Sequence, residues 1–259
     1  MTNQNKVKKN VQVELLEEIA YITLNNPPVN TISFKTMSDI HEALSVIENN
    51  DKIKAVILKG SNGHFMAGAE LNEFNEIDTK AKGTETSYIG HHLMDRMESF
   101  PKPIIALIEG ACLGGGMELA LACHIRLGAM NSVYGFPEVT LGLIPGAGGT
   151  QRLPKVIGLS KAKQMILTGA KIGAEKAEQL GILDGVYAND ELDNAGKELA
   201  EKIAQNGAIA LKYCMQAINA GWLGSEKEGY RTEAELFGAC FETEEKKERI
   251  EAFLTKRNK

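Results

Sequence analysis

Residues 103–152 hold most of the structural information in this chain and read PIIALIEGACLGGGMELALACHIRLGAMNSVYGFPEVTLGLIPGAGGTQR. Residues 104–108 are apolar and partly β-branched, and a proline and a glycine bound them, which favours a buried strand over a helix. Three glycines follow at 114–116, and residues 117–122 then have the pattern of a helix. The segment therefore predicts a buried strand, a glycine turn and a helix in succession.

The glycines at 114–116 place backbone N–H groups at the helix N-terminus, where these groups have no partner within the helix. Free donors at the positive end of a helix dipole form a site for an anion or a developing oxyanion. A second loop, residues 61–70, also follows an apolar strand, and Gly68 allows it to turn so that the N–H of Ala69 points into a pocket. A plain surface loop is the alternative. Since ligand sites in α/β folds lie beyond strand ends, we expect both loops to face one pocket.

Two glutamates lie close to these predicted donors. Glu118 falls in the first turn of the helix, where an acid that merely complements the helix dipole is the simpler explanation. Glu138 has apolar neighbours, although a solvated loop carboxylate is the simpler explanation for it alone. Burial would raise the pKa of such a carboxyl and suit it to donate a proton near neutral pH. If both converge beside an oxyanion site, they form a general acid–base pair acting on an acyl group.

Composition excludes several classes of protein. The chain has 259 residues, enough for one large domain, and its net charge of −5 without a basic run argues against a nucleic-acid partner. Four scattered cysteines without a CxxC pair predict no metal site and reduced, buried thiols in a cytoplasmic protein. No apolar stretch approaches membrane-spanning length, so we expect no membrane partner.

The order of patterns along the first half predicts a mixed α/β fold. Residues 1–10 are polar and are expected to form a flexible tail. Alternating apolar residues over 11–24 predict two strands, helical spacing covers 37–47, and residues 53–58 form another apolar strand. Strand, strand, helix and strand in this order begin a fold with repeated strand–helix crossovers. Residues 74–85 are polar and are expected to be mobile.

The second half is mainly helical. Apolar spacing predicts a helix over 84–100, and further helices cover about 208–219, 227–241 and 244–256. We divide the chain into the tail, an α/β core at 11–195 that holds the active site, and a C-terminal helical region at 196–259. Apolar faces in that last region are expected to serve subunit contacts.

Three segments carry a resemblance to a known family: FMAGAEL at 65–71, GACLGGGMELALAC at 110–123 and FPEVTLGLIPGAGGTQRLPKVIG at 136–158. The chain resembles the crotonase family, also called enoyl-CoA hydratase/isomerase, from about Val11 to Arg257. The resemblance implies an α/β fold that is a spiral of ββα units with a C-terminal helical trimerisation region. It also implies a homo-trimer, or a hexamer built from two trimers.

The resemblance implies an acyl-CoA thioester as substrate, with no separate cofactor because CoA is part of that substrate. The thioester carbonyl would lie between the backbone N–H groups of Ala69 and Gly115, the oxyanion hole, and Ala67 and Gly68 would bind the substrate beside it.

Hydratases of the family carry two glutamates, matched here by Glu118, which would activate water, and Glu138, which would exchange a proton with C2. This implies an enoyl-CoA hydratase that adds water syn to trans-2-enoyl-CoA in fatty acid or branched acyl degradation. An enoyl-CoA isomerase is the alternative within the family. A non-catalytic CoA- or RNA-binding relative is the alternative from another class.

Positions near the end of the chain also match the family. Phe237 and Lys256 resemble residues that contact CoA, partly across subunits, although a lysine in a basic tail is more often simply solvated. The chain departs from the family pattern at Glu70, where aspartate is usual, and at His124, which also replaces an aspartate. A third departure is Arg249 in place of glycine. The first two are expected to alter loop geometry or subunit packing and to leave the chemistry intact.

Overall fold

The computed structural model describes residues 10–257. The expected flexible tail at 1–10 lies outside the described residues except for Asn10. The backbone N–H of Asn10 donates to Oδ2 of Asp39 at 2.8 Å, and its side-chain amide donates to Oγ1 of Thr36 at 3.1 Å. The chain is therefore anchored from the start of its first strand.

A six-stranded sheet forms the centre of the molecule, with the order β1-β2-β3-β4-β6-β9. The first two strands pair antiparallel, and every later pair in this sheet is parallel. The strands are β1 (Val11–Leu16), β2 (Ile19–Leu24), β3 (Ala55–Gly60), β4 (Ile104–Ile108), β6 (Ile125–Ala129) and β9 (Gly185–Tyr187). The apolar runs of the sequence thus become the central parallel strands, which are buried on both faces.

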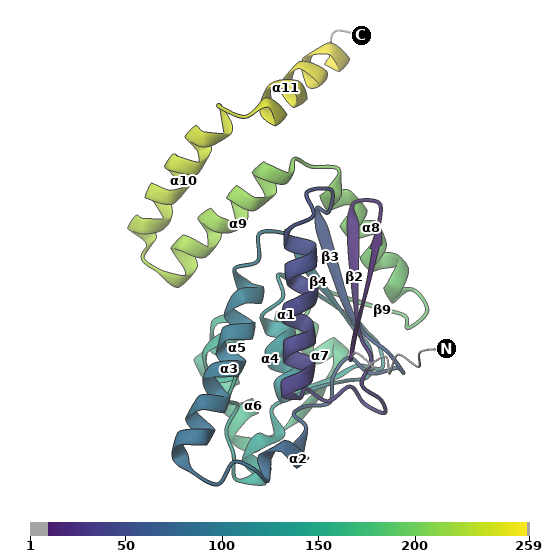
Figure 1. Cartoon of the computed structure of the whole chain (residues 1–259), viewed down its shortest axis with the longest axis vertical. Coiled ribbons are helices and arrows are strands. Elements are labelled where there is room, and N and C mark those ends of the chain that lie inside the picture. Colours follow the sequence, from purple (N-terminus) through teal and green to yellow (C-terminus); the bar gives the residue numbers. More distant parts are fainter. Residues whose placement is uncertain (1–9, 258–259) are drawn as a thin grey trace, which may run out of the picture.

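Side chains on β3 and β4 alternate between two apolar cores. Val56 and Leu58 pack on the face covered by α1 (Phe34–Glu48), together with Leu44 of that helix. Ala55 and Ile57 point to the other face, which α8 (Leu192–Ala204) covers. Figure 1 shows the two helices on opposite sides of the sheet. Because side chains alternate along a strand, each central strand is fixed in register by both cores.

A smaller three-stranded sheet, β5-β7-β8, lies beyond the end of β4. It consists of β5 (Ala111–Leu113), β7 (Val133–Gly135) and β8 (Lys171–Gly173). The remaining elements of the core are α2 (Leu71–Phe74), α3 (Lys80–Glu98), α4 (Gly115–Leu121), the 3₁₀ helix η1 (Pro137–Leu141), α5 (Gly149–Ile157), α6 (Leu159–Thr168) and α7 (Ala174–Gln179). Segments that the sequence separates, 61–70, 110–118 and 136–149, meet in this part of the fold.

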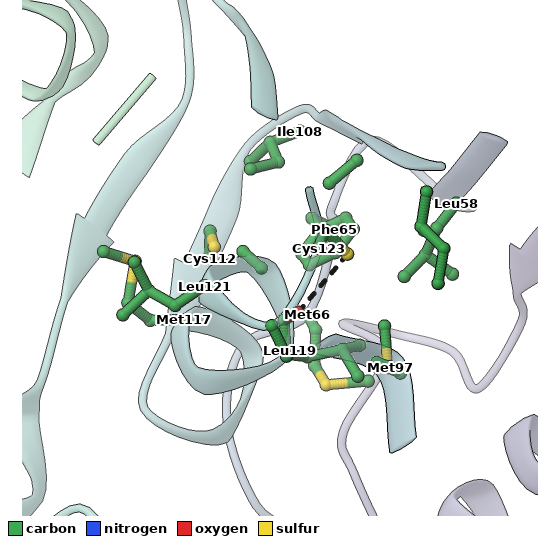
Figure 2. Packing of buried hydrophobic residues seen from close by; sticks show 14 of the residues in the cluster. Leu58, Phe65, Met66, Met97, Ile108, Cys112, Met117, Leu119, Leu121 and Cys123 are labelled. Carbon is green, nitrogen blue, oxygen red and sulfur yellow. Dashed lines mark hydrogen bonds between the residues drawn. The ribbon is translucent and has the colours of Figure 1, made fainter. Parts of the chain in front are cut away.

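Helix α4 is enclosed by apolar side chains, and residues 116–121 are all buried. Met117, Leu119 and Leu121 belong to the same apolar core as Phe65, Met66 and Met97. In Figure 2, Leu119 lies beside Met66 and Met97, and Met117 and Leu121 lie on the other side of the helix. A helix of only seven residues is not stable by itself, so this packing holds it in place. Any side chain that α4 carries therefore has a fixed position.

The C-terminal helices α9 (Ala208–Leu223), α10 (Glu226–Cys240) and α11 (Glu244–Arg257) extend away from the core in Figure 1. Helices α9 and α10 pack against each other, yet no residue of α9 is buried.

The expectation that all four cysteines are buried is wrong. Cys112 and Cys123 are buried in the core, but Cys214 on α9 is exposed and Cys240 on α10 is half-buried.

Helix α3 begins at Lys80, four residues before the helix predicted over 84–100, so the second half of the polar segment 74–85 is helical. Thr79 caps the helix, since its side-chain oxygen accepts a hydrogen bond from the Lys82 N–H at 3.3 Å. This capping hydrogen bond offsets the weak helical pattern of the polar first turns. Between residues 10 and 257, no helix has the length and apolarity needed to cross a bilayer.

Candidate active site

The two glycine-containing loops lie side by side, as the sequence predicts. The Met66 N–H donates to the Ala111 carbonyl at 2.8 Å, and the Leu113 N–H donates to the Met66 carbonyl at 3.0 Å. Buried Asn30 fixes the first loop, because its amide donates to the carbonyls of Ser61 and His64 at 2.8 and 2.7 Å. The loops are thus held by backbone pairing and one buried amide.

The N–H groups of Ala69 and Gly115 border one small space. Among the described residues neither group has a hydrogen-bond acceptor. A Cβ built on Gly115 would lie 3.9 Å from the amide nitrogen of Ala69, and both residues line the same cavity. Two neighbouring free donors are the arrangement that stabilises negative charge on a carbonyl oxygen.

Glu118 lies in the first turn of α4 and is 3% exposed. Its Oε1 accepts hydrogen bonds from the backbone N–H groups of Ala147 and Gly149, at 2.7 and 2.8 Å. Burial raises the pKa of this carboxyl to about 7, although both hydrogen bonds and the charge of Arg152 lower it. Glu118 is thus able to change protonation state near neutral pH.

Glu138 lies in the first turn of η1 and is half-buried. Its Oε2 is buried and has no hydrogen-bond partner within residues 10–257, and burial raises the pKa of the carboxyl. A Cβ built on Gly114 would lie 2.8 Å from its Oε1, so the carboxylate lies against the start of α4. The charge of Glu138 also contributes to the raised pKa of Glu118. The negative charge of Glu138 is thus close enough to affect the protonation of Glu118.

A cavity of about 460 Å³ adjoins these groups. Its lining is largely apolar, and the only ionisable side chains on it from residues 10–257 are Glu73 and Glu138. The apolar lining residues include Ile32, Met37, Leu71, Phe74, Ile77, Met94, Leu141, Leu143 and Ile144. Such a cavity fits an elongated apolar group with a polar reacting centre at one end.

The predicted site residues fall into three groups. Ala67, Gly68, Ala69, Gly115 and Glu138 line the cavity. Glu118 forms the second group: it does not line the cavity but lies behind Ala147, which does, and its Oε1 accepts a hydrogen bond from the Ala147 N–H.

Phe237 and Lys256 form the third group and do not reach the cavity. Both are exposed, on α10 and α11, and Phe237 packs edge-on against Phe241 at 5.2 Å between ring centroids. Their predicted CoA contact stays a prediction.

Several residues at the site were not predicted from the sequence. Arg152 and Ser87 contact the loop that binds Glu118, and Glu73 lines the cavity and accepts both of its hydrogen bonds from the Phe34 N–H. The motif GAGGTQR contains Arg152, but no local spacing reveals its partners. Within residues 10–257, no group of three or more His, Cys, Asp or Glu side chains is arranged to hold a metal ion.

Residues 14–259 match the sequence model of the family described as enoyl-CoA hydratase/isomerase. The chain belongs to this family. It is 39% identical to the short-chain-enoyl-CoA hydratase of Clostridium acetobutylicum, over 96% of this chain and 95% of the relative. It is 35% identical to the 2,3-dehydroadipyl-CoA hydratase of Escherichia coli, over 93% of this chain and 94% of the relative.

A solved structure of an enoyl-CoA hydratase from Bacillus anthracis superposes with a TM-score of 0.90 and 34% sequence identity. The match covers 95% of this chain and 96% of that one. The predicted enoyl-CoA hydratase/isomerase family and its α/β fold with C-terminal helices are thereby confirmed.

The three residues that depart from the family pattern each form hydrogen bonds within the chain. Glu70 caps α2, because its Oε1 accepts from the backbone N–H of Asn72 at 3.4 Å. Its Oε2 accepts from the Thr31 hydroxyl at 2.9 Å. His124 accepts the Ile104 N–H at Nδ1 at 2.9 Å, and Arg249 donates to the Gln205 carbonyl at 2.9 Å. None of these three residues lines the cavity.

We expect Gly114→Ala to lower the turnover number at least about tenfold, since the new methyl group would displace the Glu138 carboxylate. Gly114 has φ 52° and ψ −122°, so the change also costs about 1–3 kcal/mol of stability. Gly158→Ala is a matched control, because Gly158 has φ 79° and ψ 154° and a Cβ there meets nothing within 4 Å. The test measures the melting temperature and the turnover number of both variants. Equal turnover in the two variants would contradict the displacement of Glu138.

Proposed function

We propose that this chain is an enoyl-CoA hydratase that adds water to trans-2-enoyl-CoA and yields 3-hydroxyacyl-CoA. The observation that carries the proposal is the pair of carboxyls with raised pKa values, Glu118 and Glu138, beside two free backbone N–H groups. The names of relatives that match nearly the whole chain support the same activity. The enzyme would act in the degradation of fatty or branched acyl groups.

The thioester carbonyl oxygen would accept hydrogen bonds from the N–H groups of Ala69 and Gly115. Glu118 as carboxylate would take a proton from water while the water oxygen bonds to C3. The electrons of the double bond then move toward the thioester oxygen, where the two donors stabilise the negative charge. Glu138 as carboxylic acid would deliver its proton to C2. The raised pKa values suit both roles, since each group needs a different protonation state near neutral pH.

The same donors would also support an isomerase, which moves the double bond with a single acid–base group. Two carboxyls on one site favour hydration, because one must activate water while the other handles the C2 proton. The net charge of −5 does not support an RNA-binding role. We propose that the reaction uses no cofactor, since CoA enters as part of the substrate.

Glu118→Gln and Glu138→Gln should each lower hydration of crotonyl-CoA by about 100-fold or more, since each removes one proton-transfer group. The loss of the 2-enoyl thioester absorbance measures the rate. Binding of the acyl-CoA ester should stay within about threefold, because the glutamine amide keeps the shape of the site. Parental rates in both folded variants would contradict the two-carboxyl mechanism.

The cavity also indicates an uncharged acyl chain. Its two ionisable lining groups are carboxyls, so an acyl chain that ends in a carboxylate would enter an apolar and acidic space. A carboxylate buried without a partner is costly, and Glu73 would add like-charge repulsion.

We therefore expect trans-2-hexenoyl-CoA to be hydrated with a kcat/KM about 100-fold above that of 2,3-dehydroadipyl-CoA, the ω-carboxylated six-carbon analogue. Steady-state rates for the two substrates make the comparison, and Glu73→Gln should narrow the gap without slowing the hexenoyl substrate. Equal kcat/KM values for both substrates in the parent protein would contradict an uncharged acyl preference.

We propose a homo-trimer or hexamer, assembled through the C-terminal helical region at 196–259, while the core at 11–195 holds the active site. Large apolar side chains are exposed on α9, α10 and α11, among them Ile218, Trp222, Leu223, Phe237, Phe253 and Leu254. Their burial between subunits would give Phe237 and Lys256 a route to the CoA of a neighbouring subunit. We also propose that the protein is cytoplasmic, since Cys112 and Cys123 are buried free thiols, as is usual in a reducing compartment.

Light scattering of the purified chain should give a mass of three or six subunits, because burying these apolar side chains drives association. Trp222→Glu together with Phe253→Glu should shift the mass toward the monomer, since both residues are more than half exposed in the single chain. A monomeric parent protein at micromolar concentration would contradict the proposed assembly.

A further inference from the structure

We propose that Arg152 is a positioning residue for Glu118, because it anchors the 146–149 loop whose N–H groups bind that carboxylate. This inference rests on the proposed hydratase function. It assigns a role to a residue that neither touches the substrate cavity nor contacts Glu118 through a hydrogen bond.

The loop at 146–149 is the part of the site that holds Glu118. Ala147 and Gly149 donate to the same oxygen, Oε1, at 2.7 and 2.8 Å. Oε2 accepts no hydrogen bond from residues 10–257, so one oxygen is fixed and the other is left for a water molecule. The orientation of the carboxylate therefore depends on the orientation of two peptide groups.

Arg152, in the first turn of α5, forms a hydrogen bond to this loop. Its Nη1 donates to the Ala147 carbonyl at 3.2 Å, which fixes the residue whose N–H binds Glu118. The backbone of Gly148, at φ 104°, lies so close to the guanidinium that a Cβ on it would overlap Nη1. Only a glycine at position 148 therefore leaves room for the guanidinium against the loop.

The guanidinium is in turn anchored on α3. Nη2 donates to Oδ1 of Asp95 at 2.7 Å and to Oε2 of Glu98 at 2.8 Å, and Nε donates to the same Glu98 oxygen at 3.1 Å. Arg152 is 9% exposed and the Glu98 side chain is 22% exposed, so the bonds to Glu98 are partly shielded from water, whereas Asp95 is largely exposed. A planar arginine holds several such acceptors at once, which a lysine ammonium does not reproduce.

Helix α3 supports the loop at two further points. The Ser87 hydroxyl donates to the Gly146 carbonyl at 2.6 Å. A Cβ on Gly90 would lie 2.8 Å from the Cβ of Ala147, so helix and loop are in close contact. The position of Glu118 on α4 is therefore tied, through the loop and Arg152, to a helix that also lines the cavity.

Arg152 also acts on the charge of Glu118. The groups that affect this carboxyl are the Ala147 and Gly149 N–H groups, Glu138 on η1 and Arg152 on α5. Asp95 and Glu98 on α3 face the guanidinium itself. The positive charge lowers the pKa of Glu118, so its removal should raise that pKa and move the acid limb of the pH profile to higher pH.

The test is the pH profile of kcat and kcat/KM for crotonyl-CoA hydration in Arg152→Gln and Arg152→Lys. Arg152→Gln should move the acid limb to higher pH and lower kcat at least about tenfold. Arg152→Lys keeps the charge, so its acid limb should stay in place while kcat falls. KM should stay within about threefold of the parent value in both variants, because Arg152 does not line the cavity.

Arg126→Gln is the matched control. Arg126 is equally buried, 9% exposed, and binds the carbonyls of Ile182 and Cys123 and the carboxylate of Asp184. Its loss should destabilise the fold without moving the acid limb, because its charge is not among the groups that affect Glu118.

A folded Arg152→Gln with the parental kcat and acid limb would overturn the inference, as would an equal shift of the limb in Arg126→Gln. If Arg152→Gln does not fold, a parental kcat in Arg152→Lys overturns it alone. A parent protein that does not hydrate crotonyl-CoA would instead contradict the proposed function.

Discussion

The site depends on one buried interaction, the pair of hydrogen bonds from a backbone loop to Oε1 of Glu118. A carboxylate that is 3% exposed is costly without partners, and the Ala147 and Gly149 N–H groups offset part of that cost. Burial still outweighs them, since the pKa rises to about 7. The balance leaves a group that is neither permanently charged nor permanently neutral at physiological pH, which acid–base chemistry requires.

The rest of the fold holds the two sides of this interaction in place. The parallel sheet, buried on both faces, fixes β4, and the chain leaves that strand toward the glycines and α4. Apolar side chains enclose α4, so Glu118 is carried on a short helix without freedom to reorient (Figure 2). The loop on the other side is held by α3 through Arg152 and Ser87. Helix, sheet and loop thus combine to fix a geometry that no single element determines.

Much of this could be predicted from the sequence, because the signals are local. Strand alternation, the glycine turn at 114–116 and the first-turn position of Glu118 depend on neighbours a few residues apart. The meeting of the two glycine loops followed from the rule that parallel strands end at one edge.

Features that depend on distant partners could not be predicted in this way. Arg152 is separated from Glu98 by 54 residues along the chain, and no periodicity links them. The start of α3 at Lys80 is not predicted, because the polar residues of its first turns show no apolar periodicity. The predicted CoA contacts of Phe237 and Lys256 would require the proposed assembly of subunits, because both residues are exposed and lie away from the cavity of their own chain.

The measurement that tests the account most directly is hydration of crotonyl-CoA in D₂O, followed by NMR of the product. If Glu118 and Glu138 act from the same side of the bound double bond, the water oxygen goes to C3 and one deuteron goes to C2 on that side. The predicted result is 3-hydroxybutyryl-CoA with a single deuteron at C2 in the syn configuration. Anti addition, a mixture of configurations, or movement of the double bond without hydration would contradict the account.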